Sequence, residues 1–348
     1  YTDIDKPSDY FNTKLYTGNG ATNRSITGVG FQPDLTWIKA RSDTTWHHLF
    51  DAVRGANKAL NSNVNNAEGT VATFPSFDSD GFTVNGASSG NLNINNQTNA
   101  SWNWKAGTSF TNDASGTGIG SMDSAGSVNE EAGFAIVSYT GNETASTLKH
   151  GLSTVPQMII IKGLISARDW VVGQHTQGWT KSAYLNETNA FSNQTHWNNT
   201  APTSSVFTIE GGSNSNVNTN NAAYIAYVFS ERQGYSKFGT YTGNGNADGT
   251  FIYTGFKPAW LLVKSTAAND WILHDTKRNP HNVSNVILHP NASDADVTNT
   301  IYNLDILSNG FKTRTTHARL NGSGVTYIYM AFAENPFVTS TGVPATAR

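Results

Sequence analysis

Tyr16-Thr17-Gly18-Asn19 occurs twice more in the chain, at residues 139–142 and 241–244. A proline follows seventeen residues after each tyrosine, and a lysine follows six residues after each proline: Pro33 with Lys39, Pro156 with Lys162, and Pro258 with Lys264. A repeat of about a hundred residues is longer than one layer of a solenoid, which takes about 20 to 45 residues. The spacing therefore predicts three small domains in tandem.

Each copy contains short apolar runs bounded by Pro, Gly or Ser, at residues 35–39, 158–162 and 260–264. Runs of this length are typical of buried strands and are too short for helices. A tryptophan follows each run (Trp46, Trp170, Trp271), and an aromatic strand closes each copy. We therefore expect an all-β fold of three tandem antiparallel β-sandwiches, jelly-roll or lectin-like, with little helix. The residues expected in their cores are Trp37, Trp104, Phe229, Trp260 and Phe332.

The copies divide the chain into segments of unequal character. The expected organisation is a lead-in over residues 1–10, a first repeat over 11–107, a Gly/Ser-rich linker over 108–130, a diverged second repeat over 131–231, a third repeat over 232–338 and a tail over 339–348. Because few residues separate the second and third repeats, we expect these two to hold a fixed orientation. The long linker predicts that the first repeat is more independent.

Composition excludes several classes of protein. Charged residues make up 14% of the 348 residues, the formal net charge is −3, and no basic run occurs. The basic patch of a nucleic-acid-binding protein is missing, so we expect no nucleic-acid partner. No apolar stretch approaches the roughly 20 residues of a membrane span, so we expect no membrane insertion. The absence of cysteine excludes disulfides and thiolate metal sites.

Five segments of the first copy and the end of the third carry a family resemblance: residues 15–20, 30–39, 49–55, 77–82 and 102–107, with residues 327–337. They resemble the repeated module of virion structural and tail-fibre proteins of marine bacteriophages. The resemblance extends over residues 11–107 and 237–338, and the middle copy departs from it around Pro156 and Gly173. It implies a β-sandwich component of the virion surface, outside the host cell, and it transfers no catalytic residues.

The sequence lacks the patterns of the common catalytic sites. No Gly-x-Ser-x-Gly elbow, Walker loop or Rossmann fingerprint occurs, and the acidic residues are scattered, whereas a glycosidase needs a carboxylate pair. We therefore expect a protein that is not an enzyme and binds no cofactor. The adjacent His47 and His48 could ligate a metal, but no cysteine or second histidine at helical spacing supports this. We interpret them as an exposed strand end and expect no metal site.

Two groups of polar and aromatic residues have more than one interpretation. One group of aromatic and polar residues in the middle copy has two interpretations. It could bind a sugar, since aromatic faces stack on pyranose rings and amides bind hydroxyl groups, or it could belong to a core or an interface. This group comprises Trp179, His196, Trp197, Asn198 and Asn199. Asp51 with Arg54, and Asp275 with Lys277 and Arg278, are predicted to form ion pairs that lock a strand end or face a neighbouring subunit.

Together these observations predict a non-enzymatic phage virion structural protein, most simply a tail fibre or tail-associated adhesin acting in assembly and host-surface attachment. A capsid decoration or head appendage protein is the nearest alternative. A secreted array of carbohydrate-binding modules is the alternative from another class, and a polysaccharide depolymerase is a third. The expected partners are other virion proteins, a host-surface glycan and further copies of the chain. We expect a homo-oligomer, with a trimer as the expected number.

Overall fold

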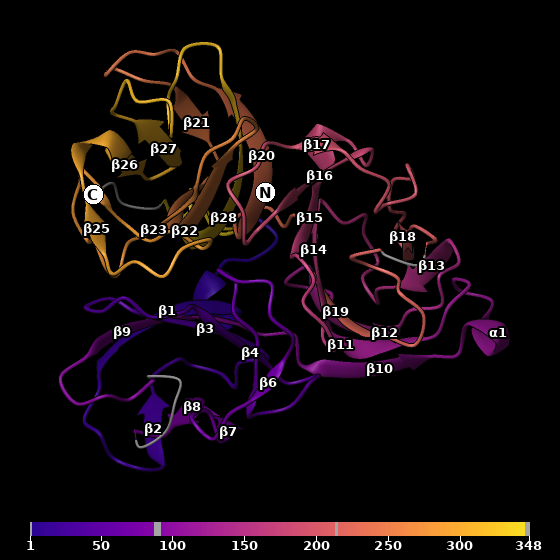
Figure 1. Cartoon of the computed structure of the whole chain (residues 1–348). Coiled ribbons are helices and arrows are strands. Elements are labelled where there is room, and N and C mark those ends of the chain that lie inside the picture. The colour runs from indigo at the N-terminus through magenta and orange to yellow at the C-terminus, as the bar shows by residue number, and fades with distance from the viewer. Residues whose placement is uncertain (1, 87–91, 213–214, 345–348) are drawn as a thin grey trace.

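The same order of four antiparallel strands occurs three times in the computed structural model, which describes residues 2–86, 92–212 and 215–344 (Figure 1). In pairing order these strands are β1 (Phe11–Thr17), β9 (Thr98–Trp104), β3 (Leu35–Ala40) and β4 (His48–Asp51); β12 (Phe134–Thr140), β19 (Ala223–Phe229), β14 (Met158–Gly163) and β15 (Val171–Gln174); and β20 (Ser236–Thr242), β28 (Thr326–Pro336), β22 (Phe256–Ser265) and β23 (Trp271–Asp275). We call residues 11–107, 108–231 and 232–338 units 1, 2 and 3. The fold is all-β and antiparallel, as the sequence predicts.

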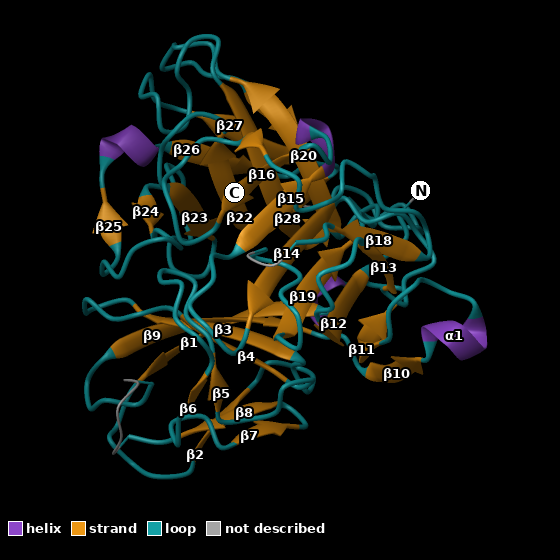
Figure 2. Cartoon of the chain, turned by 45° about the vertical axis from the view of Figure 1, so that its right-hand side comes forward, coloured by secondary structure: helices purple, strands orange, loops and turns teal. Residues whose placement is uncertain are grey.

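A smaller sheet covers one face of each four-stranded group (Figure 2). These smaller sheets are β2 (Arg24–Thr27), β8 (Gly81–Val84) and β7 (Ser76–Asp78) in unit 1; β13 (Ser146–Lys149) and β18 (Val206–Ile209) in unit 2; and β21 (Phe251–Tyr253), β27 (Gly310–Thr313) and β26 (Leu304–Leu307) in unit 3. Each pair of sheets encloses an apolar cluster belonging to its own unit, in which Ile26, Leu148 and Ile252 occupy matching positions. The units are therefore β-sandwiches.

The remaining elements, apart from two further strands of unit 2 described below, are short. They are the strand pairs β5 (Lys58–Ala59) with β6 (Gly69–Thr70) and β24 (Val286–Ile287) with β25 (Val297–Thr298), the strands β16 (Lys181–Tyr184) and β17 (Ser192–Asn193) that extend the sheet of unit 2, the helix α1 (Ala114–Thr117), and the 3-10 turns Pro7–Asp9, His175–Gln177 and Thr300–Tyr302. The lead-in packs on the units rather than projecting from them, since Ile4 is buried in the central core.

The other faces of the three large sheets meet in one central core. This apolar cluster contains residues of all three units, among them Trp37, Trp104, Phe229, Trp260 and Phe332, the five predicted core residues. Figure 1 shows the three sheets arranged around this region. Each large sheet is thus buried on both faces, between the central core and the cluster of its own unit.

Burial on both faces explains the continuous apolar runs in the sequence. In β14, Met158 and Ile160 point to the central core while Ile159 and Ile161 belong to the cluster of unit 2. Successive side chains of a strand point to opposite faces, so a strand between two cores is apolar at every position. β22 repeats this pattern, with alternate residues divided between the two cores.

Two expectations about the domain organisation are corrected. Residues 108–130, predicted as a linker, form β10 (Thr108–Asn112), α1 and β11 (Ser124–Asn129), and both strands join the sheet of unit 2. Unit 1 is not independent, because its large sheet contributes to the same central core as the other two units. Ser, Thr and Gly dominate these added strands, so their sequence lacks the apolar alternation that identifies a half-buried strand.

The repeated Tyr-Thr-Gly-Asn motif has the same structural role in every unit. Each tyrosine hydroxyl is buried and donates to a backbone carbonyl near the start of the closing strand: Tyr16 to Leu92 at 2.7 Å, Tyr139 to Val217 at 2.8 Å, and Tyr241 to Leu320 at 2.7 Å. The motif therefore ties β1, β12 and β20 to the loop that precedes the closing strand of the same unit.

The glycine and asparagine of the motif bind that same loop. A Cβ on Gly141 would lie 2.2 Å from the carbonyl oxygen of Thr219, so only glycine allows the two backbones to approach. The backbone N–H of the motif asparagine donates to the side-chain Oδ1 of a fully buried asparagine of the loop, at 3.1, 2.8 and 3.0 Å in units 1, 2 and 3. These buried asparagines are Asn93, Asn218 and Asn321.

Replacing Asn321 by alanine is expected to lower the free energy of unfolding by about 1 to 3 kcal/mol, because buried groups lose their partners. Its amide nitrogen donates to Asn244 Oδ1 and to the carbonyls of Asn246 and Thr315, each at 2.8 Å. Urea unfolding measures the change. Asn246→Ala, an exposed asparagine in the loop that Asn321 binds, is the matched control and should cost less than N321A. Equal losses for the two variants would contradict the role given to the buried asparagine.

Candidate functional site at the junction of the three units

The residues considered for sugar binding do not form an aromatic surface. Trp197 is fully buried, and Trp179 and His196 are 8% and 5% exposed. Trp197 packs edge-on against Trp179 at 5.2 Å and donates from Nε1 to Ser182 Oγ at 2.9 Å. The sugar-binding interpretation of these side chains is therefore wrong, because a pyranose cannot reach their ring faces.

The two asparagines of that group, Asn198 and Asn199, are exposed and have positive φ angles of 48° and 51°. They form a turn after Trp197. Trp197 also explains why unit 2 has Gly173 in the central part of β15: a Cβ there would lie 2.5 Å from the indole ring. Trp179, His196 and Trp197 are therefore core residues, which is the alternative that the sequence left open.

The five predicted core residues lie together at the junction of the three units. Trp260 of unit 3 contacts Trp37 and Trp104 of unit 1, with ring centroids 6.4 and 5.6 Å apart. Phe229 of unit 2 contacts Phe332 of unit 3 at 6.1 Å. The repeated aromatic residues thus hold different units to one another rather than filling three separate cores.

Two buried ion pairs lie at the edge of this junction, and both were predicted. Asp51 and Arg54 are joined at 2.5 Å, and Asp275 pairs with Arg278; all four side chains are almost completely buried. Each arginine also binds a second carboxylate, Glu68 for Arg54 and Asp296 for Arg278. The pairs lock the end of the fourth strand in units 1 and 3.

The same carboxylates accept hydrogen bonds from a neighbouring unit. Trp102 Nε1 of unit 1 donates to Asp275 Oδ2 of unit 3 at 3.2 Å, and the Tyr227 hydroxyl of unit 2 donates to Asp51 Oδ2 of unit 1 at 2.8 Å. Trp102 and Tyr227 occupy matching positions in their closing strands. The third junction has Met330 and Gln174 at these two positions, so it cannot repeat the bond to a carboxylate.

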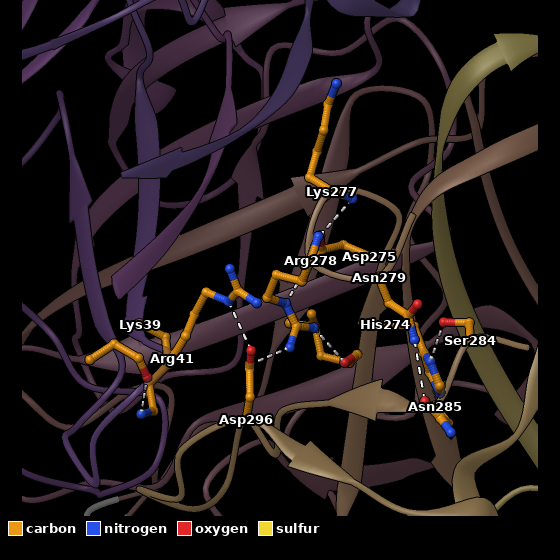
Figure 3. Close-up of polar contacts among 12 residues, drawn as sticks. Lys39, Arg41, His274, Asp275, Lys277, Arg278, Asn279, Ser284, Asn285 and Asp296 are labelled. Atoms are coloured by element: carbon orange, nitrogen blue, oxygen red, sulfur yellow. Dashed lines mark hydrogen bonds and ion pairs between the residues drawn. The ribbon is translucent and has the colours of Figure 1, made fainter. Parts of the chain in front are cut away.

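Asp296 extends this arrangement across the boundary of units 1 and 3. It accepts from Arg278 of its own unit at 2.8 Å and from Arg41 of unit 1 at 2.8 Å (Figure 3). Figure 3 shows the two guanidinium groups on either side of this carboxylate. Arg278 is completely buried while Asp296 and Arg41 are partly exposed, so the loss of Asp296 would leave the buried guanidinium with Asp275 as its remaining carboxylate partner.

The residue that pairs with the repeated lysine on the neighbouring strand, Trp271 opposite Lys264 for example, also joins the units. Trp170 Nε1 of unit 2 donates to the Asn61 carbonyl of unit 1 at 2.9 Å, and Trp271 Nε1 of unit 3 donates to the Tyr184 carbonyl of unit 2 at 2.9 Å. In unit 1 the strand register places His47 at this position.

The sequence placed Trp46 at that position, which is wrong by one residue: Trp46 is 46% exposed. The interpretation of His47 and His48 as an exposed strand end is also wrong, because both are buried. His47 Nδ1 accepts from Trp37 Nε1 at 2.9 Å, and burial lowers the pKa of His47 well below its usual value. A neutral imidazole in the core is consistent with that hydrogen bond.

The three repeated lysines, Lys39, Lys162 and Lys264, are fully buried and donate to backbone carbonyls. Lys162 Nζ, for example, binds the carbonyl of Gly163 at 2.8 Å and that of Asn65, in unit 1, at 3.2 Å. Burial lowers the pKa of each lysine to about 8. Lys162 and Lys264 therefore bind a carbonyl of a neighbouring unit, whereas Lys39 binds carbonyls of its own unit. Burial of each ammonium group costs desolvation free energy.

Because the pKa of each buried lysine is lowered to about 8, the free energy of unfolding is expected to rise with pH above 8. Between about pH 8 and 10.5 the unfolded chain keeps protons on these lysines that the folded chain has lost, so the unfolded state binds more protons and the free energy of unfolding increases with pH. From pH 8 to 9.5 the gain should be about 1 to 2 kcal/mol per lysine. Urea unfolding across this range measures it.

Removing one of the three lysines tests whether they cause this pH dependence. Lys264→Met should reduce the slope of stability against pH by about a third, because one of three titrating groups is gone. Tyrosines with raised pKa values, such as Tyr329, oppose the gain above about pH 10, so the range below pH 10 is the informative one. A slope of zero between pH 8 and 9.5 would show that the lysines are not desolvated as the structure places them.

This arrangement joins three sheets and presents no group of side chains suited to a metal. Within residues 2–86, 92–212 and 215–344, no three His, Asp or Glu side chains lie close enough to hold an ion. Among the same residues no helix has the length and apolar character needed to cross a bilayer. The side chains of the junction hold the three units together through apolar contacts and hydrogen bonds.

Comparison with known proteins gives a family and no function. No curated protein matches the chain, and no solved structure matches it. One family model, described as a domain of unknown function (DUF7483), matches residues 6–336 and so spans all three units as a single domain. The chain belongs to the DUF7483 family.

Proposed function

We propose that this chain is a structural protein of a bacteriophage virion, most simply a tail fibre or tail-associated adhesin, which acts in particle assembly and attachment to the host surface. The resemblance of residues 11–107 and 237–338 to the modules of such proteins supports the proposal. A capsid decoration or head appendage protein is the nearest variant of the same function.

The observation that carries the proposal is the shared central core. Three sandwiches that bury their large sheets against one another form one block, and the buried Trp, Asp, Arg and Lys side chains are used to hold the units together. A rigid block with a threefold arrangement of similar units suits a component that must keep its shape in a symmetric appendage. We propose that it acts as a homo-oligomer together with other virion proteins.

Quantitative mass spectrometry of purified particles tests this function. The chain should be present in particles that have been washed at high salt, at a copy number that is constant between preparations. Detection only in the cell-free supernatant, with none in particles, would overturn the proposal. The outcome does not depend on which surface the chain uses to associate.

A further inference from the structure

β21, at the edge of the small sheet of unit 3, carries two exposed aromatic residues. Phe251 is 44% exposed and Tyr253 is 57% exposed, while Ile252 between them is buried in the core of the unit. The two rings therefore lie on the outer face of the sheet, separated by one residue that points inward.

The matching strands of the other units show that the fold does not need aromatic residues there. Ile26 of unit 1 and Leu148 of unit 2 pair with Phe82 and Phe207 as Ile252 pairs with Phe311. The residues on either side of them are small or polar: Ser25 and Thr27 in β2, and Thr147 and Lys149 in β13. Phe251 and Tyr253 are thus specific to unit 3.

The backbone of β21 is also open on one side. Thr313 N donates to the Thr250 carbonyl at 3.1 Å, and Thr254 N donates to the Asn309 carbonyl at 2.9 Å, so alternate residues of this strand face β27. The N–H and C=O groups of Phe251 and Tyr253 point the other way. In the described part of the chain no strand pairs with that side of β21.

In unit 2 the same edge is covered by the chain itself. The Thr147 carbonyl accepts from Ser121 N at 2.9 Å and from Met122 N at 3.2 Å, and Thr147 N donates to Ser121 Oγ at 2.9 Å. These two residues lie between α1 and β11, in the segment that unit 2 adds before β12. An extended segment therefore fits against this edge of the repeated sandwich.

We propose that β21 of a second copy of the chain covers this edge in unit 3, as an antiparallel pair around a twofold axis at Ile252. Phe251 then lies opposite Tyr253 of the partner subunit, and each such pair exchanges both backbone hydrogen bonds. The two aromatic residues of one strand meet those of the other on the outer face. The sequence Phe-Ile-Tyr is self-complementary in this register, as an isologous contact requires.

Charge on the surrounding surface is compatible with such an approach. Beside β21, Asp248 binds Lys312 at 2.7 Å and Arg314 at 2.9 Å, and Arg314 also lies 3.3 Å from Asp305. The two positive and two negative side chains balance one another, so two copies of this surface meet without net repulsion. The inference deepens the proposed self-association and rests on it, but it concerns one contact only.

Sedimentation velocity of the purified full chain, from micromolar to submillimolar concentration, tests the contact. The wild-type chain should form a dimer in a concentration-dependent way. Tyr253→Pro removes the N–H group that points outward and leaves the hydrogen bonds of Ile252 to β27 in place, so it should remain folded and become monomeric. Circular dichroism confirms that the fold is kept.

A second variant and a matched control complete the design. The double variant F251K/Y253K changes exposed side chains only and should also be monomeric, since lysines on an edge strand oppose strand pairing. S25K/T27K, at the matching positions of unit 1, should dimerise as the wild type does. A wild-type chain that stays monomeric throughout, or dimers that persist in both β21 variants, would overturn the inference, whereas the proposed virion function is decided separately by its presence in particles.

Discussion

Lowering the pH from 7 to about 4.5 is expected to unfold the whole chain, because several buried histidines must take up protons when it unfolds. Burial lowers the pKa of His48 and of His150 to about 4 and that of His274 to about 3. For His47 the pKa also falls well below 6.5. These imidazoles belong to units 1, 2 and 3, so acid acts on every unit.

The direction follows from the proton balance. Below pH 6.5 the unfolded chain protonates these histidines while the folded chain does not, so the unfolded state binds more protons and stability falls as the pH falls. By pH 4.5 the protonation of His48, His150 and His274 in the unfolded chain should lower the free energy of unfolding by about 2 kcal/mol for each residue, or roughly 6 kcal/mol together. Protonation of His47 lowers it further. This loss is comparable with the entire free energy of unfolding of a typical protein, about 5 to 15 kcal/mol.

Unfolding measured by intrinsic fluorescence across this pH range gives the check. His274→Asn should reduce the number of protons taken up on unfolding by about one. His281→Gln removes an exposed histidine of the same unit and is the matched control. An unchanged urea midpoint between pH 7 and 4.5 would contradict the burial of these side chains.

Replacing Trp260 by alanine is expected to destabilise the whole chain, by about 3 to 5 kcal/mol. Trp260 is 1% exposed and packs against Phe11, Trp37 and Trp104 of unit 1 as well as Phe332 of its own unit. The cavity would therefore open at the centre of the molecule. Urea unfolding should show a single transition at a lower denaturant concentration, so that units 1 and 3 unfold together.

Trp46→Ala is the control for this change, since that tryptophan is 46% exposed and should cost less than about 1 kcal/mol. Unfolding in two steps, with only unit 3 destabilised in the Trp260 variant, would mean that the units have separate cores after all.

Local features of the repeat could be predicted from the sequence, because they depend on residues close together in one unit. The strands at residues 35–39 and 260–264, and the ion pairs of Asp51 and Asp275, lie where the repeated pattern indicates. The burial of Trp260 also follows from its place in an apolar run.

The contact between units could not be predicted, because an apolar run shows that both faces of a strand are buried but not what covers each face. The error at Trp46 has a different cause: a shift of one residue moves a side chain to the opposite face of a strand, and the interval to the tryptophan varied by one between copies. The buried Asn93, Asn218 and Asn321 were missed because one asparagine among many carries no periodic signal. Each does follow an apolar residue, which could have marked it: Leu92, Val217 and Leu320.

Native-state hydrogen exchange with increasing denaturant tests the shared central core most directly, since it reports the free energy at which each strand opens. The slowest amides of β3, β14 and β22 lie in three different units. We predict that they exchange with the same free energy and the same denaturant dependence, and that Trp260→Ala lowers all three by equal amounts. Three distinct opening free energies, with only β22 affected by the substitution, would contradict the account.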